Sequence, residues 1–256
     1  MIKSYKNLLR LLTGAVVLYA GSASAASFMD EFVDPTNPNQ FIRADAFESG
    51  NDTAFSETAD FPDTILGGYR DLYLEIESRE DVSPQSGAAA DVFDGIMRFN
   101  NDTGIKSKLQ LTYDGQDNSS ELDTMGLEGL DLTADGATGF GLNIIEADRN
   151  PFFITAAIYS GDQMSSVTLD FNEEIIDDGT PREAFFAFDQ FEGIDLTDVG
   201  AVQFTFEGPD ALDMRVGPIT MAEEVSSAEI PEPTSLLALA GVSALGVSYR
   251  RRKCKS

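Results

Sequence analysis

The chain has 256 residues and a formal net charge of −27. It contains no histidine, which excludes histidine-dependent catalytic triads, histidine zinc sites and histidine general bases. The one cysteine, Cys254, lies in the C-terminal tail. We therefore expect a central domain with neither a disulfide nor a thiol nucleophile.

Residues 1–25 have the three parts of a secretory signal peptide. A positively charged start is followed by an apolar stretch at 11–20 that is expected to be helical, and then by the small residues Ala23 and Ala25. We predict cleavage by signal peptidase between Ala25 and Ala26. The alternative is an N-terminal anchor helix, but the apolar stretch is short for a bilayer.

Residues 26–63 are polar and contain three prolines, so they are expected to be irregular or to hold the first strands. From 64 to 222, apolar and polar residues alternate in short runs, and this pattern predicts half-buried strands. The clearest runs are 69–77, 105–113, 167–171, 202–207 and 212–216, and the segment 152–159 is apolar on both faces, which predicts a central strand. Turn signals such as Asp-Gly separate them. We predict an all-β domain at 64–222, an antiparallel β-sandwich or jelly roll.

One segment is repeated within the domain. The sequence "EGLDLTADGATGF" at 128–140 aligns without gaps with "EGIDLTDVGAVQF" at 192–204. We expect Asp131 and Asp195 to accept hydrogen bonds from nearby backbone amides in two equivalent turns. Each turn would lead into a new strand, one in each sheet.

The strand layout, with its Asp-Leu-Thr turns, "GGYRDLYLEI" at 67–76 and "ALDMRVGPI" at 211–219, loosely resembles jelly-roll carbohydrate-binding and galactose-binding-like modules. The resemblance implies an exposed aromatic platform for sugar. The chain has no tryptophan, so the candidates are tyrosines that can equally be core residues. They are Tyr69, Tyr73, Tyr113 and Tyr159.

Two acidic clusters could hold calcium, which binds through oxygen ligands. They are "DGQDNSSELD" at 114–123 and "NEEIIDDG" at 172–179. Neither has EF-hand spacing, and solvated loops are the simpler interpretation in so acidic a chain. The chosen calcium candidates are Asp114, Asp117, Asp123 and Asp213; no other cofactor is expected.

A linker is expected at 223–230, and the tail 231–256 has three parts. The triplet Pro231-Glu232-Pro233 precedes an apolar run at 234–249, and a basic cluster of Arg250, Arg251, Arg252 and Lys253 follows. A helix over this run would be roughly 24 Å long, a minimal transmembrane span whose basic end stays cytoplasmic. The prolines keep the triplet extended outside the membrane.

This tail resembles the PEP-CTERM sorting signal. The resemblance implies transient membrane insertion, processing by an exosortase (a membrane transpeptidase of Gram-negative bacteria), and export to the cell surface or the exopolysaccharide matrix. An ordinary single-span anchor is the alternative.

The two ends hold eight basic residues and one acidic residue, so 26–230 has a net charge of −34. Such a surface repels nucleic acid, and we expect no nucleic-acid partner. Three functions remain open. The leading hypothesis is a non-enzymatic surface or matrix protein. The alternative is a carbohydrate-binding module, with or without calcium, that binds extracellular polysaccharide. The third is a glycan hydrolase that uses two carboxylates.

Overall fold

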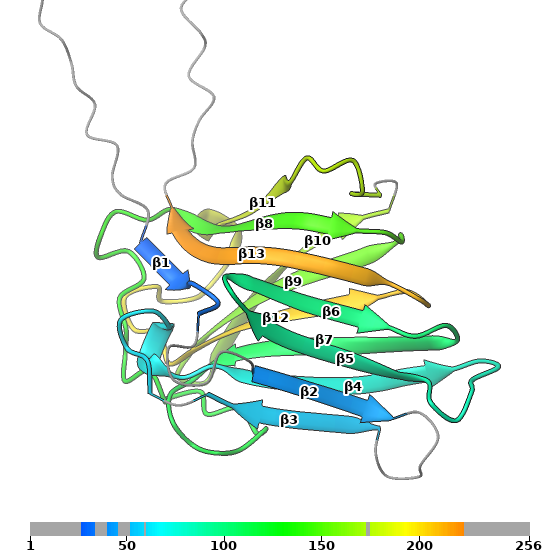
Figure 1. The fold of residues 1–256 in the computed structure, drawn as a ribbon. Coiled ribbons are helices and arrows are strands. Elements are labelled where there is room, and N and C mark those ends of the chain that lie inside the picture. Colours follow the sequence, from blue (N-terminus) through cyan, green and yellow to red (C-terminus); the bar gives the residue numbers. More distant parts are fainter. Residues whose placement is uncertain (1–26, 34–39, 46–51, 59, 173–174, 223–256) are drawn as a thin grey trace, which may run out of the picture.

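Two antiparallel sheets pack face to face in the computed structural model (Figure 1). The described residues are 27–33, 40–45, 52–58, 60–172 and 175–222. The predicted signal helix, the linker and the C-terminal transmembrane helix lie outside them. Within these ranges, no helix has the length and apolar character needed to cross a membrane.

The domain is built almost wholly from strands. In chain order the elements are β1 (Ser27–Asp30), β2 (Gln40–Asp45), β3 (Thr53–Glu57), the 3-10 helix η1 (Leu66–Gly68), β4 (Asp71–Arg79), β5 (Gly87–Phe93), β6 (Ile96–Asn101), β7 (Ile105–Tyr113), β8 (Gly139–Ala147), β9 (Phe152–Ser160), β10 (Gln163–Phe171), β11 (Arg182–Ala187), the 3-10 helix η2 (Phe188–Gln190), β12 (Ala201–Gly208) and β13 (Asp213–Ala222).

The first sheet has the strand order β11-β8-β13-β6-β5-β2, with β1 added to β13. The second sheet has the order β10-β9-β12-β7-β4-β3. All neighbouring strands run antiparallel. The predicted antiparallel β-sandwich is therefore confirmed.

The core lies between the sheets, and strand alternation explains its composition. On β4, Leu72 and Leu74 point inward and are fully buried, whereas Tyr73 between them faces outward and is half-buried. Phenylalanines join the layers: the rings of Phe140 on β8 and Phe204 on β12 meet edge to face, 5.4 Å apart. The apolar positions predicted from the alternation in the sequence are the ones that line the core.

The repeated segments form the expected matching turns and lie side by side. Asp131 accepts hydrogen bonds from the backbone amide and hydroxyl of Thr133, and Asp195 does the same with Thr197. Backbone hydrogen bonds join the two units, including a reciprocal pair between Leu130 and Val199. The first unit leads into β8 of the first sheet and the second into β12 of the second sheet.

Candidate metal centre and outer face of the second sheet

The outer face of the second sheet carries polar side chains in register. One row across its six strands consists of Phe55, Tyr73, Gln110, Thr205, Thr155 and Thr168. The next row consists of Glu57, Asp71, Thr112, Gln203, Ala157 and Ser166. Amides and hydroxyls bond across strands: Gln203 donates to Thr112 at 2.9 Å, and the hydroxyls of Thr155 and Thr168 lie 2.8 Å apart.

Aromatic side chains lie near both edges of this face. Phe55 and Tyr73 are direct cross-strand partners near one edge, and Phe153 and Tyr159 lie on β9 near the other; all four are half-buried. A hollow of about 230 Å³ opens beside Phe153, and its lining includes Glu77, Lys106, Pro151 and Glu207. Tyr113 is a core residue with no exposed surface, so it is not a sugar platform.

Four carboxylates gather where β3 ends, β4 begins and β7 ends. Glu57, Asp71, Asp114 and Asp117 are called the acidic cluster below. One carboxylate oxygen from each of Glu57, Asp71 and Asp117 lies within 4.8 Å of the others. Asp114 directly follows β7 and interacts electrostatically with Asp71. Asp71 is only 4% exposed and Asp114 only 2%.

Backbone amides of the 117–123 loop hold three of the four carboxylates in place. Oε2 of Glu57 accepts hydrogen bonds from the amides of Asp117 and Asn118, at 3.0 and 2.8 Å. Oδ2 of Asp114 accepts one from the amide of Asp123 at 2.8 Å. Oδ1 of Asp117 accepts one from Ser119. The loop therefore fixes one oxygen on each of three carboxylates.

Two other oxygens of the cluster have no such partner. Oδ1 of Asp71 and Oδ1 of Asp114 are buried and, in the described part of the chain, accept no hydrogen bond. Burial raises the pKa of Asp71 to about 8, and the neighbouring charges of Asp114, Glu57 and Asp117 add to this effect. Burial also raises the pKa of Asp114 to about 6, although the amide of Asp123 opposes the rise. The cluster thus retains either protons or a cation.

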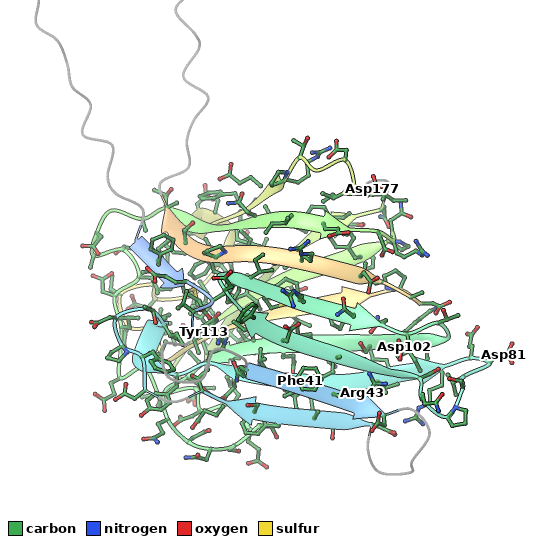
Figure 2. All side chains as sticks on the ribbon, viewed as in Figure 1. Phe41, Arg43, Asp81, Asp102, Tyr113 and Asp177 are labelled. Carbon is green, nitrogen blue, oxygen red and sulfur yellow. The ribbon has the colours of Figure 1, made fainter. Side chains whose placement is uncertain are left out.

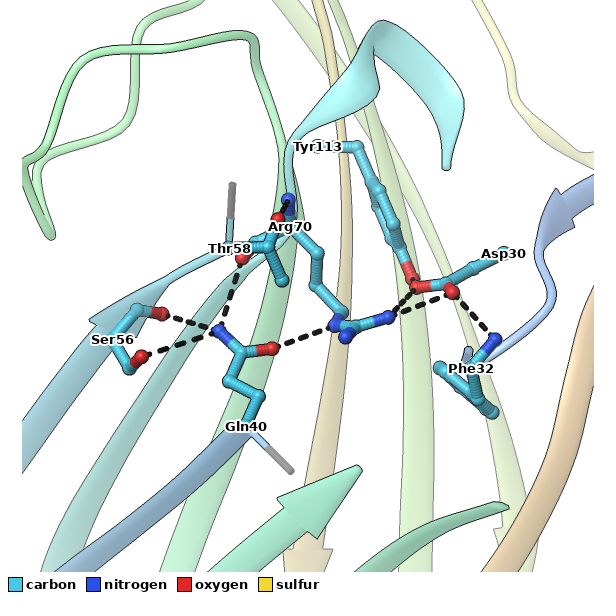
Figure 3. A network of polar contacts seen from close by, with 7 residues as sticks. All are labelled: Asp30, Phe32, Gln40, Ser56, Thr58, Arg70 and Tyr113. Atoms are coloured by element: carbon cyan, nitrogen blue, oxygen red, sulfur yellow. Dashed lines mark hydrogen bonds and ion pairs between the residues drawn. The ribbon is translucent and has the colours of Figure 1, made fainter. Parts of the chain in front are cut away.

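A buried polar network beneath the cluster positions its strands (Figure 3). Arg70 donates to both carboxylate oxygens of Asp30 at 2.8 Å and to Gln40 at 2.9 Å. The hydroxyl of Tyr113 donates to Asp30 at 2.8 Å, and Gln40 donates to the carbonyl of Ser56 at 2.8 Å.

Three residues of this network each lie one position before a cluster carboxylate. Ser56, Arg70 and Tyr113 immediately precede Glu57, Asp71 and Asp114. Because successive side chains in a strand point to opposite faces, the inward network and the outward carboxylates share the same backbone. The network therefore fixes the positions from which the carboxylates converge.

A close backbone contact shapes the loop above the cluster. A Cβ on Gly126 would lie 1.5 Å from the carbonyl oxygen of Asp114, so only glycine fits there. Gly115 adopts φ +83°, which also favours glycine. These two residues let the 115–126 loop fold back onto the end of β7.

The structure separates the four calcium candidates of the sequence. Asp114 and Asp117 belong to the acidic cluster, and Asp123 supports it through its backbone amide. Asp213 begins β13 in the first sheet, at the opposite end of the sandwich, beside Asp148. Its pKa is raised by partial burial and then by Asp148.

The second acidic segment is only partly described. Asp178 accepts hydrogen bonds from Thr180 and Arg182 in a turn, and Figure 2 shows Asp177 on the first-sheet side, far from Tyr113. The sorting and cleavage residues lie outside the described ranges. Glu57 and Asp71 were missed by sequence reasoning because each stands alone in its own strand.

Comparison with known proteins adds one functional finding. Residues 229–253 match the family described as "PEP-CTERM protein-sorting motif". The match confirms the resemblance of the tail, and the motif indicates export and sorting to the cell envelope of Gram-negative bacteria. No curated protein matches the chain.

Solved structures similar to this chain include several carbohydrate-binding modules. The Family 11 module of cellulosomal cellulase Lic26A-Cel5E of Clostridium thermocellum is 10% identical, with a TM-score of 0.36; the match covers 79% of this chain and 96% of that one. The non-crystalline cellulose-specific module CBM28 is 12% identical, with a TM-score of 0.30, and the match covers 59% and 78%. The likeness is one of fold.

Proposed function

We propose that the protein is exported by its signal peptide, held briefly in the inner membrane by its C-terminal helix, and processed by an exosortase. Its mature domain then acts at the cell surface or in the exopolysaccharide matrix. The observation that carries this proposal is the sorting motif at 229–253. Within it, Pro231-Glu232-Pro233 provides the extended processing site, and Arg250, Arg251 and Arg252 hold the end of the span in the cytoplasm.

The intact mass of the protein released by an exosortase-containing host tests this proposal. We expect the released protein to lack residues 1–25 and the segment that follows the Pro-Glu-Pro triplet. Deletion of the exosortase should leave the full C-terminal mass on membrane-bound protein. Released protein that retains the tail would contradict processing at this site.

The second candidate function is non-catalytic binding of extracellular polysaccharide on the outer face of the second sheet. The specific support is the in-register row of amides and hydroxyls, flanked by Tyr73 and Phe153. Amides and hydroxyls exchange hydrogen bonds with sugar hydroxyls, and aromatic faces pack on sugar rings. Hydrolysis is disfavoured because Asp71 and Asp114, the two carboxylates of the acidic cluster whose pKa values burial raises, are buried away from a polymer.

A glycan array, run with and without calcium, tests this binding with the full chain in a mild detergent. We expect Tyr73→Ala and Phe153→Ala to weaken binding to the recognised glycan about tenfold each, equivalent to about 1.4 kcal/mol. Phe41→Ala is the matched control, because Phe41 is 59% exposed on the first sheet (Figure 2). No binding to any glycan, or equal loss in the control, would contradict the proposal.

A further inference from the structure

We propose that Glu57, Asp71, Asp114 and Asp117 bind one calcium ion at the end of the second sheet. The site is independent of the sorting motif and differs from the sequence-based candidates by the two residues that come from β3 and β4. Two separate observations support it: the convergence of three carboxylates with Asp114 beside them, and the two buried carboxylate oxygens that lack a hydrogen-bond partner.

The charge of the acidic cluster calls for a cation. Three carboxylates offer oxygens within 4.8 Å of one another, and Asp114 adds a fourth negative charge beside them. In the described part of the chain, no lysine or arginine forms a salt bridge with any of the four. Buried charges are normally paired or coordinate a metal. A divalent cation would supply that missing partner.

The hydrogen bonds of the cluster divide its oxygens into two sets. Backbone amides occupy Oε2 of Glu57, Oδ2 of Asp114 and Oδ1 of Asp117. Oδ1 of Asp71 and Oδ1 of Asp114 are buried and accept no hydrogen bond from the described residues. Metal-ligating carboxylates typically use one oxygen for the ion while the other is oriented by a neighbour. The first set would therefore orient the carboxylates, and the second would face the ion.

The donor set selects the ion. All donors are oxygens, and the chain has no histidine and no cysteine outside its tail, which disfavours zinc and copper. Calcium accepts about six to eight oxygens in irregular geometry, whereas magnesium requires a near-ideal octahedron and keeps several waters. Carboxylate oxygens from β3, β4, the end of β7 and the 117–123 loop, completed by water, suit calcium.

Isothermal titration of the full chain in non-ionic detergent, after removal of metal with EDTA, tests the site. We expect one calcium per chain with a dissociation constant of about 1 mM or below, as for extracellular calcium modules. Asp71→Asn and Asp114→Asn should each weaken binding by at least about tenfold. Magnesium should bind at least about tenfold more weakly than calcium.

Asp81→Asn is the matched control. Asp81 is exposed just beyond the other end of β4, and Figure 2 shows it at the opposite end of the sandwich from Tyr113. Asparagine suits its φ of 51°. This variant loses the same charge, so it should bind calcium as the wild type does. If Asp81→Asn weakened calcium binding as much as the cluster variants do, the effect would come from net charge alone, and the assignment of the site would be overturned.

Folding is monitored in the same samples by circular dichroism. Asp117→Asn provides a second route if a buried variant fails to fold, because asparagine can still accept the hydrogen bond from Ser119 at this half-buried position. It should also weaken calcium binding at least about tenfold. Absence of saturable calcium binding to the wild type, or unchanged affinity in a folded Asp71→Asn or Asp117→Asn variant, would overturn the proposal.

Discussion

Loss of Arg70 is expected to be among the most damaging single changes in the domain. Arg70 and Asp30 are both 0% exposed, and their ion pair is made at 2.8 Å to both carboxylate oxygens. Arg70→Met removes this partner and leaves Asp30 as a buried carboxylate that, among the described residues, is held by Tyr113 and the amide of Phe32. Breaking one side of a buried ion pair typically costs about 3–5 kcal/mol.

The lost hydrogen bond from Arg70 to Gln40 adds roughly 1 kcal/mol. We therefore expect Arg70→Met to lower the free energy of unfolding by about 5 kcal/mol. For a domain of this size that is about 10–20 °C in melting temperature. The assay is urea unfolding of the full chain in non-ionic detergent, followed by far-ultraviolet circular dichroism.

A double-mutant cycle separates pairing from packing. Arg70→Met with Asp30→Leu removes both charges, so its loss should fall short of the sum of the single losses by about 2 kcal/mol or more. Arg215→Met breaks a half-exposed pair with Glu146 and should cost less than about 1 kcal/mol. Strict additivity of the two core variants, or equal losses for Arg70→Met and Arg215→Met, would refute this reasoning.

Three further predictions concern the loops and the acidic cluster. Gly126→Ala should destabilise the domain by about 2 kcal/mol or more, because the new Cβ would meet the carbonyl oxygen of Asp114. In the control Gly217→Ala, the nearest neighbour of the new Cβ is 3.5 Å away, so stability should change by less than about 0.5 kcal/mol. A Gly126→Ala variant as stable as the wild type would contradict the close contact. Asp131→Ala and Asp195→Ala should each cost about 1 kcal/mol in urea unfolding, since they lose the same pair of hydrogen bonds; very unequal losses would argue against equivalent turns. In EDTA, the wild type should lose stability relative to Asp71→Asn as pH rises from about 5 to 8, by up to about 1.4 kcal/mol per pH unit. The reason is that the pKa of Asp71 is raised to about 8 in the folded state, so its carboxyl binds more protons there than in the unfolded chain. Parallel profiles of stability against pH for the two proteins would show that the carboxyl of Asp71 is not perturbed.

Local chemistry explains what could be predicted about the fold. Strand alternation at 69–77 and 105–113 predicted β4 and β7, because a sheet with one buried face requires an apolar residue at every second position. The Asp131 and Asp195 turns were predictable because each hydrogen bond spans two residues. The sorting motif was readable because its three parts are contiguous at 229–253.

The acidic cluster needed the tertiary structure. Asp114 and Asp117 were visible as neighbours in one loop, but strand pairing alone brings Asp71 opposite Glu57. The same holds for Arg70, whose partner Asp30 lies 40 residues earlier in the chain. In sequence, Arg70 is an ordinary polar residue before a strand; in the structure it is fully buried.

The sequence by itself therefore determined the class of fold, the matching turns and the sorting motif, because each depends on residues close together in the chain. Only the tertiary structure decided which carboxylates converge, which tyrosine is core and which face of the sandwich carries a polar row. Those properties depend on strand order and register. Both are set by pairings between distant segments, which no local pattern specifies.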